Sequence, residues 1–214
     1  MPPHPPISPT SSPPELRSLT LRLWVAFALG SSAFGFASQW TPKLLANAGL
    51  SADQGIIGGI MLSFGGTLGS LIFGVLTTRV HARRLLIATC VTAAVTLVGF
   101  ILSTNTPGLM FALGVVAGMF LNGCITGFYT VIPASYPSHL RTTGMGAANG
   151  ITRLATLVSP ILVGYLVDGG WSPLALYCAF AALTVVGGAC LLGLRPGTHI
   201  VIEKKAAAPT PVAV

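Results

Sequence analysis

The sequence predicts an all-α integral membrane protein with six transmembrane helices. Charged residues make up only 7% of the 214 residues, and hydrophobic residues make up 52%. Soluble domains carry about a quarter charged residues. The mean hydropathy is +0.81. So few charges cannot cover a surface that faces water, so most of the exterior must face lipid.

Six apolar runs are each long enough to cross the hydrocarbon core of a bilayer, which takes about 20 helical residues. They cover residues 21–40, 54–76, 84–103, 108–132, 143–167 and 173–194. The number and length of these runs predict the six helices directly.

The composition outside the runs predicts the domain organisation. Residues 1–18 are rich in Pro and Ser and are expected to form a disordered cytoplasmic tail. Residues 19–195 form the six-helix transmembrane domain. Residues 196–214 are expected to form a flexible cytoplasmic tail, because they are polar and rich in Pro and Ala.

The basic residues predict the orientation in the membrane. They gather near both termini and in the loops after the second and fourth runs, whereas the other loops contain only Lys43. Cytoplasmic loops carry an excess of Lys and Arg, so both termini are expected on the cytoplasmic side of a cytoplasmic (inner) membrane. The net charge of +7 is spread between apolar runs and does not form the dense patch that nucleic-acid binding needs.

Glycines repeat at intervals of four residues within the runs. Small residues at this interval let the backbones of two membrane helices approach closely, so these glycines are expected to mark helix contacts. The pairs are Gly55 with Gly59, Gly65 with Gly69, Gly114 with Gly118, and Gly123 with Gly127.

Arg153 is the most informative polar residue. It lies about ten residues into the fifth run, near the middle of the bilayer by rise per residue. A cation at that depth is costly and usually faces a protein interior or a watery cavity. We therefore predict a substrate cavity; an arginine that only bonds neighbouring carbonyls is the alternative. The predicted cavity residues are Arg153, Asn149, Asn122, Tyr129 and Gln39.

Two of these predictions leave an alternative open. Asn122 and Tyr129 lie on the fourth run and line the cavity, or else form hydrogen bonds between helices. Gln39 lies at the end of the first run and is expected at the cavity on weaker grounds.

Catalysis is not expected. The histidines lie in tails or loops, and the acids lie away from the middle of every run, so no reactive pair, metal site or cofactor site is predicted. The histidines are His4, His81, His139 and His199, and the acids are Glu15, Asp53, Asp168 and Glu203.

Two segments resemble the loops of major facilitator superfamily transporters. The segment from Tyr136 to Asp168 resembles the region around helices ten and eleven, with its Tyr-Pro, its Arg-x-x-Gly and an arginine in a glycine-rich helix. GVLTTRVHARR resembles the G-x-x-x-D-R-x-G-R-R loop between helices eight and nine, although Thr78 replaces the usual acid. The cytoplasmic loop residues that match are Gly74, Arg79, Arg83, Arg141 and Gly144.

The segment from Phe34 to Gly55 is similar to helix seven of the aromatic acid:proton symporter family. The resemblance covers residues 17–195 and corresponds to helices seven to twelve, the C-terminal half, built from two three-helix repeats. It implies secondary active, proton-coupled transport of small organic or aromatic acids. Because alternating access needs two halves, an N-terminal half or a second copy is an expected partner. The alternative is a non-transporting truncated half or membrane scaffold.

Overall fold

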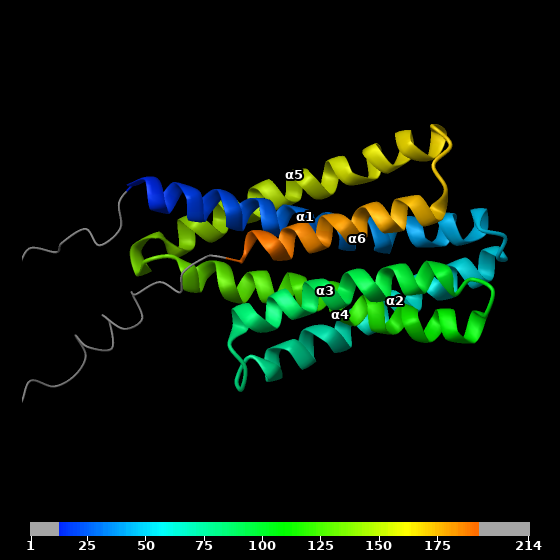
Figure 1. The fold of residues 1–214 in the computed structure, drawn as a ribbon, viewed down its shortest axis with the longest axis horizontal. Coiled ribbons are helices and arrows are strands. Elements are labelled where there is room, and N and C mark those ends of the chain that lie inside the picture. The colour runs from blue at the N-terminus through cyan, green and yellow to red at the C-terminus, as the bar shows by residue number, and fades with distance from the viewer. Residues whose placement is uncertain (1–12, 193–214) are drawn as a thin grey trace, which may run out of the picture.

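The computed structural model describes residues 13–192, and these fold into a bundle of six long helices (Figure 1). All six are long and apolar enough to cross a membrane, which confirms the predicted all-α membrane fold. The helices are α1 (Pro13–Asn47), α2 (Ala52–Leu76), α3 (Ala82–Leu102), α4 (Pro107–Ser135), α5 (Arg141–Asp168) and α6 (Pro173–Cys190), with a 3₁₀ turn η1 (Ser138–Leu140) before α5.

Two helix ends differ from the prediction. Helix α1 begins at Pro13 and so includes residues 13–18, which the sequence assigned to a disordered tail. Proline is tolerated in the first turn, where its missing N–H has no partner to lose. Helix α4 continues through Pro133 to Ser135, because a proline this close to the end removes few helical bonds. The predictions for residues 1–12 and 193–214 lie outside the described residues.

Short connections make neighbouring helices antiparallel. The start of α1 and the end of α6 therefore lie at the same end of the bundle, together with the α2–α3 and α4–α5 connections (Figure 1). Ser51 and Gln54 form a capping box that starts α2. Gly49 and Gly170 have positive φ angles of 97° and 83° just after α1 and α5, where the chain leaves the helix.

The helices form two units of three, α1 to α3 and α4 to α6, and the contacts made by one unit match those made by the other. The first helix of each unit packs on the second helix of the other unit: α1 packs on α5, and α4 packs on α2. The third helices, α3 and α6, pack on each other. Because each unit contains an odd number of spans, the second unit runs inverted with respect to the first. This is the arrangement that the predicted repeats require.

Glycines set the closest contact, between α2 and α4. A Cβ atom on Gly65 or Gly118 would lie 1.9 Å from a carbonyl oxygen of the opposite helix, and one on Gly69 would lie 2.0 Å away. No side chain fits at such distances, so the two backbones touch. The predicted role of these glycines in helix packing is confirmed.

Candidate functional site

A cavity of about 540 Å³ lies between α1, α4 and α5. Helix α5 supplies one wall with a single stripe of residues, spaced three or four apart so that they share one helix face. This stripe consists of Asn149, Thr152, Arg153, Thr156 and Leu157. The polar face predicted around Arg153 therefore lines a real cavity.

Helix α1 supplies the opposite wall. Phe27, Ser31, Gly35 and Gln39 follow one another at intervals of four residues and all line the cavity. Gly35 leaves room in this wall, because a Cβ on it would make only an ordinary contact, 3.8 Å from the Thr156 methyl group of α5. The two walls thus run side by side across the middle of the bundle.

Aromatic rings make part of the cavity apolar. Phe34 lines it from α1, and the Phe27 ring meets the Tyr129 ring edge-on with the centroids 5.4 Å apart. The Phe27 ring also packs against Phe128, at 5.3 Å between centroids. Tyr129 Oη donates a hydrogen bond to Asn149 Oδ1 at 3.0 Å, which joins α4 to α5. These contacts fix the aromatic wall in place.

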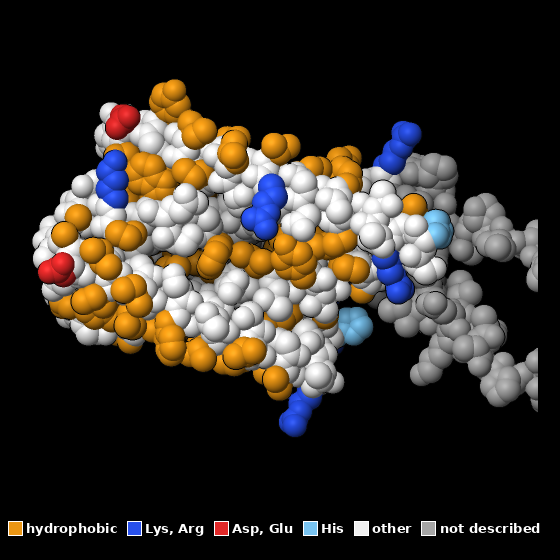
Figure 2. Space-filling view, turned by 180° about the vertical axis from the view of Figure 1, so that it is seen from behind, with side chains coloured by type: hydrophobic (Ala, Val, Ile, Leu, Met, Phe, Trp, Pro, Cys, Tyr) orange, Lys and Arg blue, Asp and Glu red, His pale blue; other side chains and the backbone are white. Residues whose placement is uncertain are grey.

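Arg153 supplies the positive charge of the cavity. Its side chain is exposed and lines the cavity near the middle of α5. Figure 2 shows a basic side chain midway along the bundle with hydrophobic side chains around it, whereas the acidic side chains lie at one end. Asp53 and Asp168, the two acids whose side chains the structure describes, lie next to the start of α2 and at the end of α5, so neither is placed to neutralise this cation.

The structure brings four of the five predicted cavity residues together: Gln39, Tyr129, Asn149 and Arg153. Asn122 does not line the cavity. Its side-chain Nδ2 donates to the carbonyl of Gly66 on α2 at 2.7 Å. Asn122 and Tyr129 lie almost two turns apart along the same face of α4, and at these two levels the side chains bond different helices: Asn122 bonds α2, and Tyr129 bonds α5. The alternative of a hydrogen bond between helices is therefore correct for Asn122.

Sequence reasoning missed Phe27, Ser31, Phe34 and Thr152. A signal for the first two was present, because residues 27, 31, 35 and 39 continue one helix face back from Gln39. Thr152 directly precedes Arg153 and is buried, which no spacing within α5 reveals.

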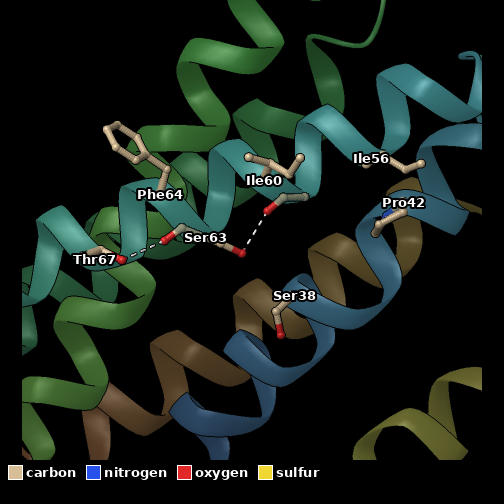
Figure 3. Close-up of a pocket in the computed structure, with 8 residues that line it drawn as sticks. Ser38, Pro42, Ile56, Ile60, Ser63, Phe64 and Thr67 are labelled. Atoms are coloured by element: carbon tan, nitrogen blue, oxygen red, sulfur yellow. Dashed lines mark hydrogen bonds between the residues drawn. The ribbon is translucent and has the colours of Figure 1, made fainter.

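A second hollow of about 480 Å³ lies between α1 and α2 (Figure 3). Ser38 lines both hollows, so they adjoin. Ile56, Ile60 and Phe64 form much of its surface. No charged residue lines it, and its polar groups are hydroxyls and backbone. It therefore offers less to an ionic solute than the cavity around Arg153.

The predicted loop motif residues hold helix ends rather than the cavity. Arg83 Nη2 donates to the Leu191 carbonyl at the end of α6, and Arg141 Nε donates to the Tyr136 carbonyl at 3.2 Å. The Tyr136 ring packs on Gly144, where a Cβ would lie only 2.7 Å from it. These contacts tie α3 to α6 and α4 to α5.

Gly74 and Arg79, the other two motif residues, are exposed at the end of α2 and just after it. A Cβ on Gly74 would meet nothing within 4 Å. Within residues 13–192, no three His, Cys, Asp or Glu side chains are grouped closely enough to hold a metal ion.

Comparison with known proteins identifies the family. Residues 23–214 match the Major Facilitator Superfamily. The chain belongs to this superfamily. The match covers most of the chain, including every residue of the cavity, and confirms the resemblance seen in the two loops. The protein is therefore a multi-pass membrane protein of a transporter family and not an enzyme.

Several relatives within the superfamily are named as transporters of aromatic acids. The 3-(3-hydroxy-phenyl)propionate transporter of Escherichia coli K12 is 30% identical over 82% of this chain and 43% of its own length. The 4-hydroxybenzoate transporter of Acinetobacter baylyi is 26% identical over 72% of this chain and 34% of its own length. The benzoate transport protein of the same organism is 25% identical over 71% of this chain. The chain spans less than half the length of these relatives.

Proposed function

We propose that the chain binds small aromatic carboxylates and carries them across the cytoplasmic membrane as the C-terminal half of a proton-coupled secondary transporter. The observation that supports this function is Arg153, a cation in mid-span that faces a cavity with aromatic walls. The names of the relatives agree with a solute of this class.

The cavity contains the groups that an aromatic carboxylate needs. A guanidinium group binds a carboxylate through two parallel hydrogen bonds, and the attraction is stronger away from bulk water. The rings of Phe27, Phe34 and Tyr129 offer apolar surface to the ring of the solute. The amides of Gln39 and Asn149 can orient it. The volume of about 540 Å³ lies within the usual range for small-molecule sites, roughly 300–1,000 Å³.

Proton coupling and alternating access require groups from outside this chain. No carboxylate lies in mid-span within residues 13–192, so in this proposal the coupling proton binds to a residue of a partner half. A partner that supplies this residue is an N-terminal half, which would close the cavity from the exposed side of α5. The basic residues at the terminal end of the bundle support cytoplasmic termini.

Transport by the purified chain in proteoliposomes tests the proposal. With a separately produced N-terminal half in the same membrane, we expect saturable uptake of radiolabelled 4-hydroxybenzoate that requires an inward proton gradient and stops when a protonophore is added. An Arg84→Ala variant, altered at an exposed arginine near the membrane surface, is the matched control and should transport normally. A folded chain that shows no uptake even with that half favours the second candidate below.

The second candidate is a non-transporting membrane scaffold or partner-binding fragment. The lack of a mid-span carboxylate in this chain favours it, since such a chain has no evident group for proton coupling. Adding a separately produced N-terminal half to the same proteoliposomes separates the two candidates. Uptake that appears only with that half would show that this chain is one part of a two-part carrier.

A further inference from the structure

Lys43 holds its charge against an aromatic ring at the far end of the bundle, the end opposite the chain termini. Its Nζ lies 4.9 Å from the centroid of the Trp40 ring, which is one turn earlier on α1. Within residues 13–192, every other Lys or Arg lies in mid-span or at the terminal end. A cation–π contact restrains an otherwise mobile side chain, so the far end presents one positive charge at a defined place.

Lys43 continues the row of α1 residues that lines the cavity around Arg153. That row passes through Gly35 and Gln39, four residues apart, and Lys43 occupies the next position, one turn beyond. Gln39 and Lys43 are both exposed. Figure 2 shows one basic side chain near the far end and another midway along the bundle, on the same face. The lysine therefore lies just beyond the cavity, on the side away from the termini.

The two cations are too far apart to hold one small solute together. Helices α1 and α5 both run toward the far end, and Gly35 lies opposite Thr156. Arg153 is three residues before Thr156, and Lys43 is eight after Gly35, so they lie about 16 Å apart along the bundle at 1.5 Å per residue. Anything that binds at Lys43 thus occupies a separate site.

Trp40 supplies apolar surface beside the lysine. Its ring reaches from α1 to α5, where a Cβ on Gly164 would lie 3.9 Å from the indole Cη2 and Cζ2 atoms. The ring is partly exposed. An indole next to an ammonium group offers the two contacts that an aromatic carboxylate needs, ring on ring and anion on cation.

The acids at the far end confine this attraction to the lysine. Asp53 lies next to the start of α2, and Asp168 ends α5. Both repel an anionic solute, so among the described residues at this end Lys43 is the one that attracts it.

We propose that Lys43 and Trp40 form a second, weaker site for aromatic carboxylates, from which the solute passes into the cavity and on to Arg153. The ammonium group bonds the carboxylate, and the indole packs on the solute ring. This inference takes the class of solute from the proposed function and adds an entry site to it. In the proposed orientation the site faces the outside, where a solute for uptake arrives.

Tryptophan fluorescence of the purified full chain tests the site. Trp24→Phe and Trp171→Phe leave Trp40 as the only one of the three tryptophans, and Arg153→Ala removes the charge of the cavity. A nitroaromatic ring quenches indole fluorescence on contact. In this parent variant 4-nitrobenzoate should quench saturably, and the uncharged 4-nitrobenzamide should not. Adding Lys43→Gln should weaken 4-nitrobenzoate binding about two- to tenfold, the worth of one hydrogen bond.

Two further variants of the parent control for charge alone. Lys43→Arg keeps the charge in place and should bind like the parent. Lys43→Gln combined with Asn47→Lys moves the charge one turn further from the cavity, to another exposed position, and should bind as weakly as Lys43→Gln. Recovery of binding in this double variant would show that any positive charge at this end suffices and would overturn the site. Equal quenching by the two probes would also overturn it.

The entry role is tested with Arg153 present. Lys43→Gln should slow the association of radiolabelled 4-hydroxybenzoate with the cavity about two- to tenfold and leave its dissociation rate unchanged, as expected for a charge at the rim of a site. Equal association rates would overturn the entry role. The quenching assay is done without Arg153, so its failure leaves the proposed function standing. Binding of 4-hydroxybenzoate that does not depend on Arg153 would instead count against the proposed function.

Discussion

At the scale of single residues, the motif arginines and the cavity arginine have different surroundings. Arg83 and Arg141 end on backbone carbonyls at helix ends, where a cation is favoured by the partial negative charge of the helix C-terminus. Arg153 instead faces the cavity in mid-span. The first two therefore stabilise the fold, and the third is available for a solute.

Removing Arg83 should destabilise the protein without touching the cavity. Arg83→Ala loses the charged hydrogen bond to the Leu191 carbonyl and the contact between α3 and α6. We expect a loss of about 1–2 kcal/mol and a melting temperature lower by about 2–8 °C. A thiol-reactive dye can follow unfolding in a background in which the exposed Cys178 and the half-buried Cys190 are replaced by alanine, because the remaining Cys90 and Cys124 are buried.

The control for this stability measurement is Arg84→Ala, one residue further along α3 and exposed. It should melt at the temperature of the wild type. Equal melting temperatures for Arg83→Ala and the wild type would show that the bond at the end of α6 contributes nothing.

The site residues that the sequence predicted are those whose side chains are unusual for a membrane span. Arg153 was predictable because a cation in mid-span is costly anywhere except a cavity. Asn122 was misplaced because an amide can be satisfied by a cavity or by a neighbouring carbonyl, and spacing alone does not distinguish the two. Ser31 and Thr152 were missed because most hydroxyls in helices bond their own backbone.

At the scale of helices, the contact between α2 and α4 depends on the absence of side chains. Gly65, Gly69 and Gly118 place backbone against backbone, whereas α1 and α5 are held apart enough to leave a cavity. The two related helix pairs of the inverted repeats thus serve different purposes. One pair anchors the bundle, and the other forms the candidate site.

An alanine at Gly65 should separate α2 from α4. Its Cβ would lie 1.9 Å from a carbonyl oxygen, and neither backbone can yield without moving the helix. Overpacking of this kind costs about 1–3 kcal/mol, so Gly65→Ala should melt at a lower temperature or fail to elute as a single species in size-exclusion chromatography.

Gly146→Ala is the matched control on α5. A Cβ there meets nothing within 4 Å, and alanine favours a helix over glycine by up to about 1 kcal/mol. It should melt at or above the wild-type temperature. A Gly65→Ala variant as stable as Gly146→Ala would mean that α2 and α4 do not touch in the protein.

Helix number and type were predictable from the sequence, but helix ends were less so. The apolar length of each run fixes a span, since the bilayer requires it. A hydropathy pattern marks the apolar part of a membrane helix and misses the polar helical turns at its ends. For that reason α1 begins earlier than predicted and α4 ends later. Contacts between helices, such as α1 on α5, depend on three-dimensional packing that no local pattern specifies.

At the scale of the whole molecule, charge separates the two ends of the bundle. The loops at the terminal end carry arginines, and Asp53 and Asp168 lie at the opposite end, where Figure 2 shows acidic side chains. This asymmetry predicts the orientation of the bundle in a membrane, with the terminal end on the cytoplasmic side.

Cysteine labelling tests the orientation. In a background without native cysteines, Asn105→Cys should react with a membrane-impermeant maleimide in intact cells, because this exposed residue lies in the α3–α4 connection. His81→Cys, in the α2–α3 connection, should react only after the cells are permeabilised. The reverse pattern would place the termini outside and contradict the proposed orientation.

The central claim is that Arg153 binds the carboxylate of an aromatic solute in the cavity between α1, α4 and α5. The most direct test is equilibrium binding of radiolabelled 4-hydroxybenzoate to the purified wild type and to Arg153→Ala, Arg153→Lys and the control Arg84→Ala. We predict saturable binding that Arg153→Ala weakens roughly 10- to 100-fold, the worth of a charged hydrogen bond. The affinity of Arg153→Lys should lie between those of the wild type and Arg153→Ala, since lysine keeps the charge but loses the paired hydrogen bonds of the guanidinium group. Arg84→Ala should bind with the affinity of the wild type. Wild-type affinity in a folded Arg153→Ala variant would contradict the claim.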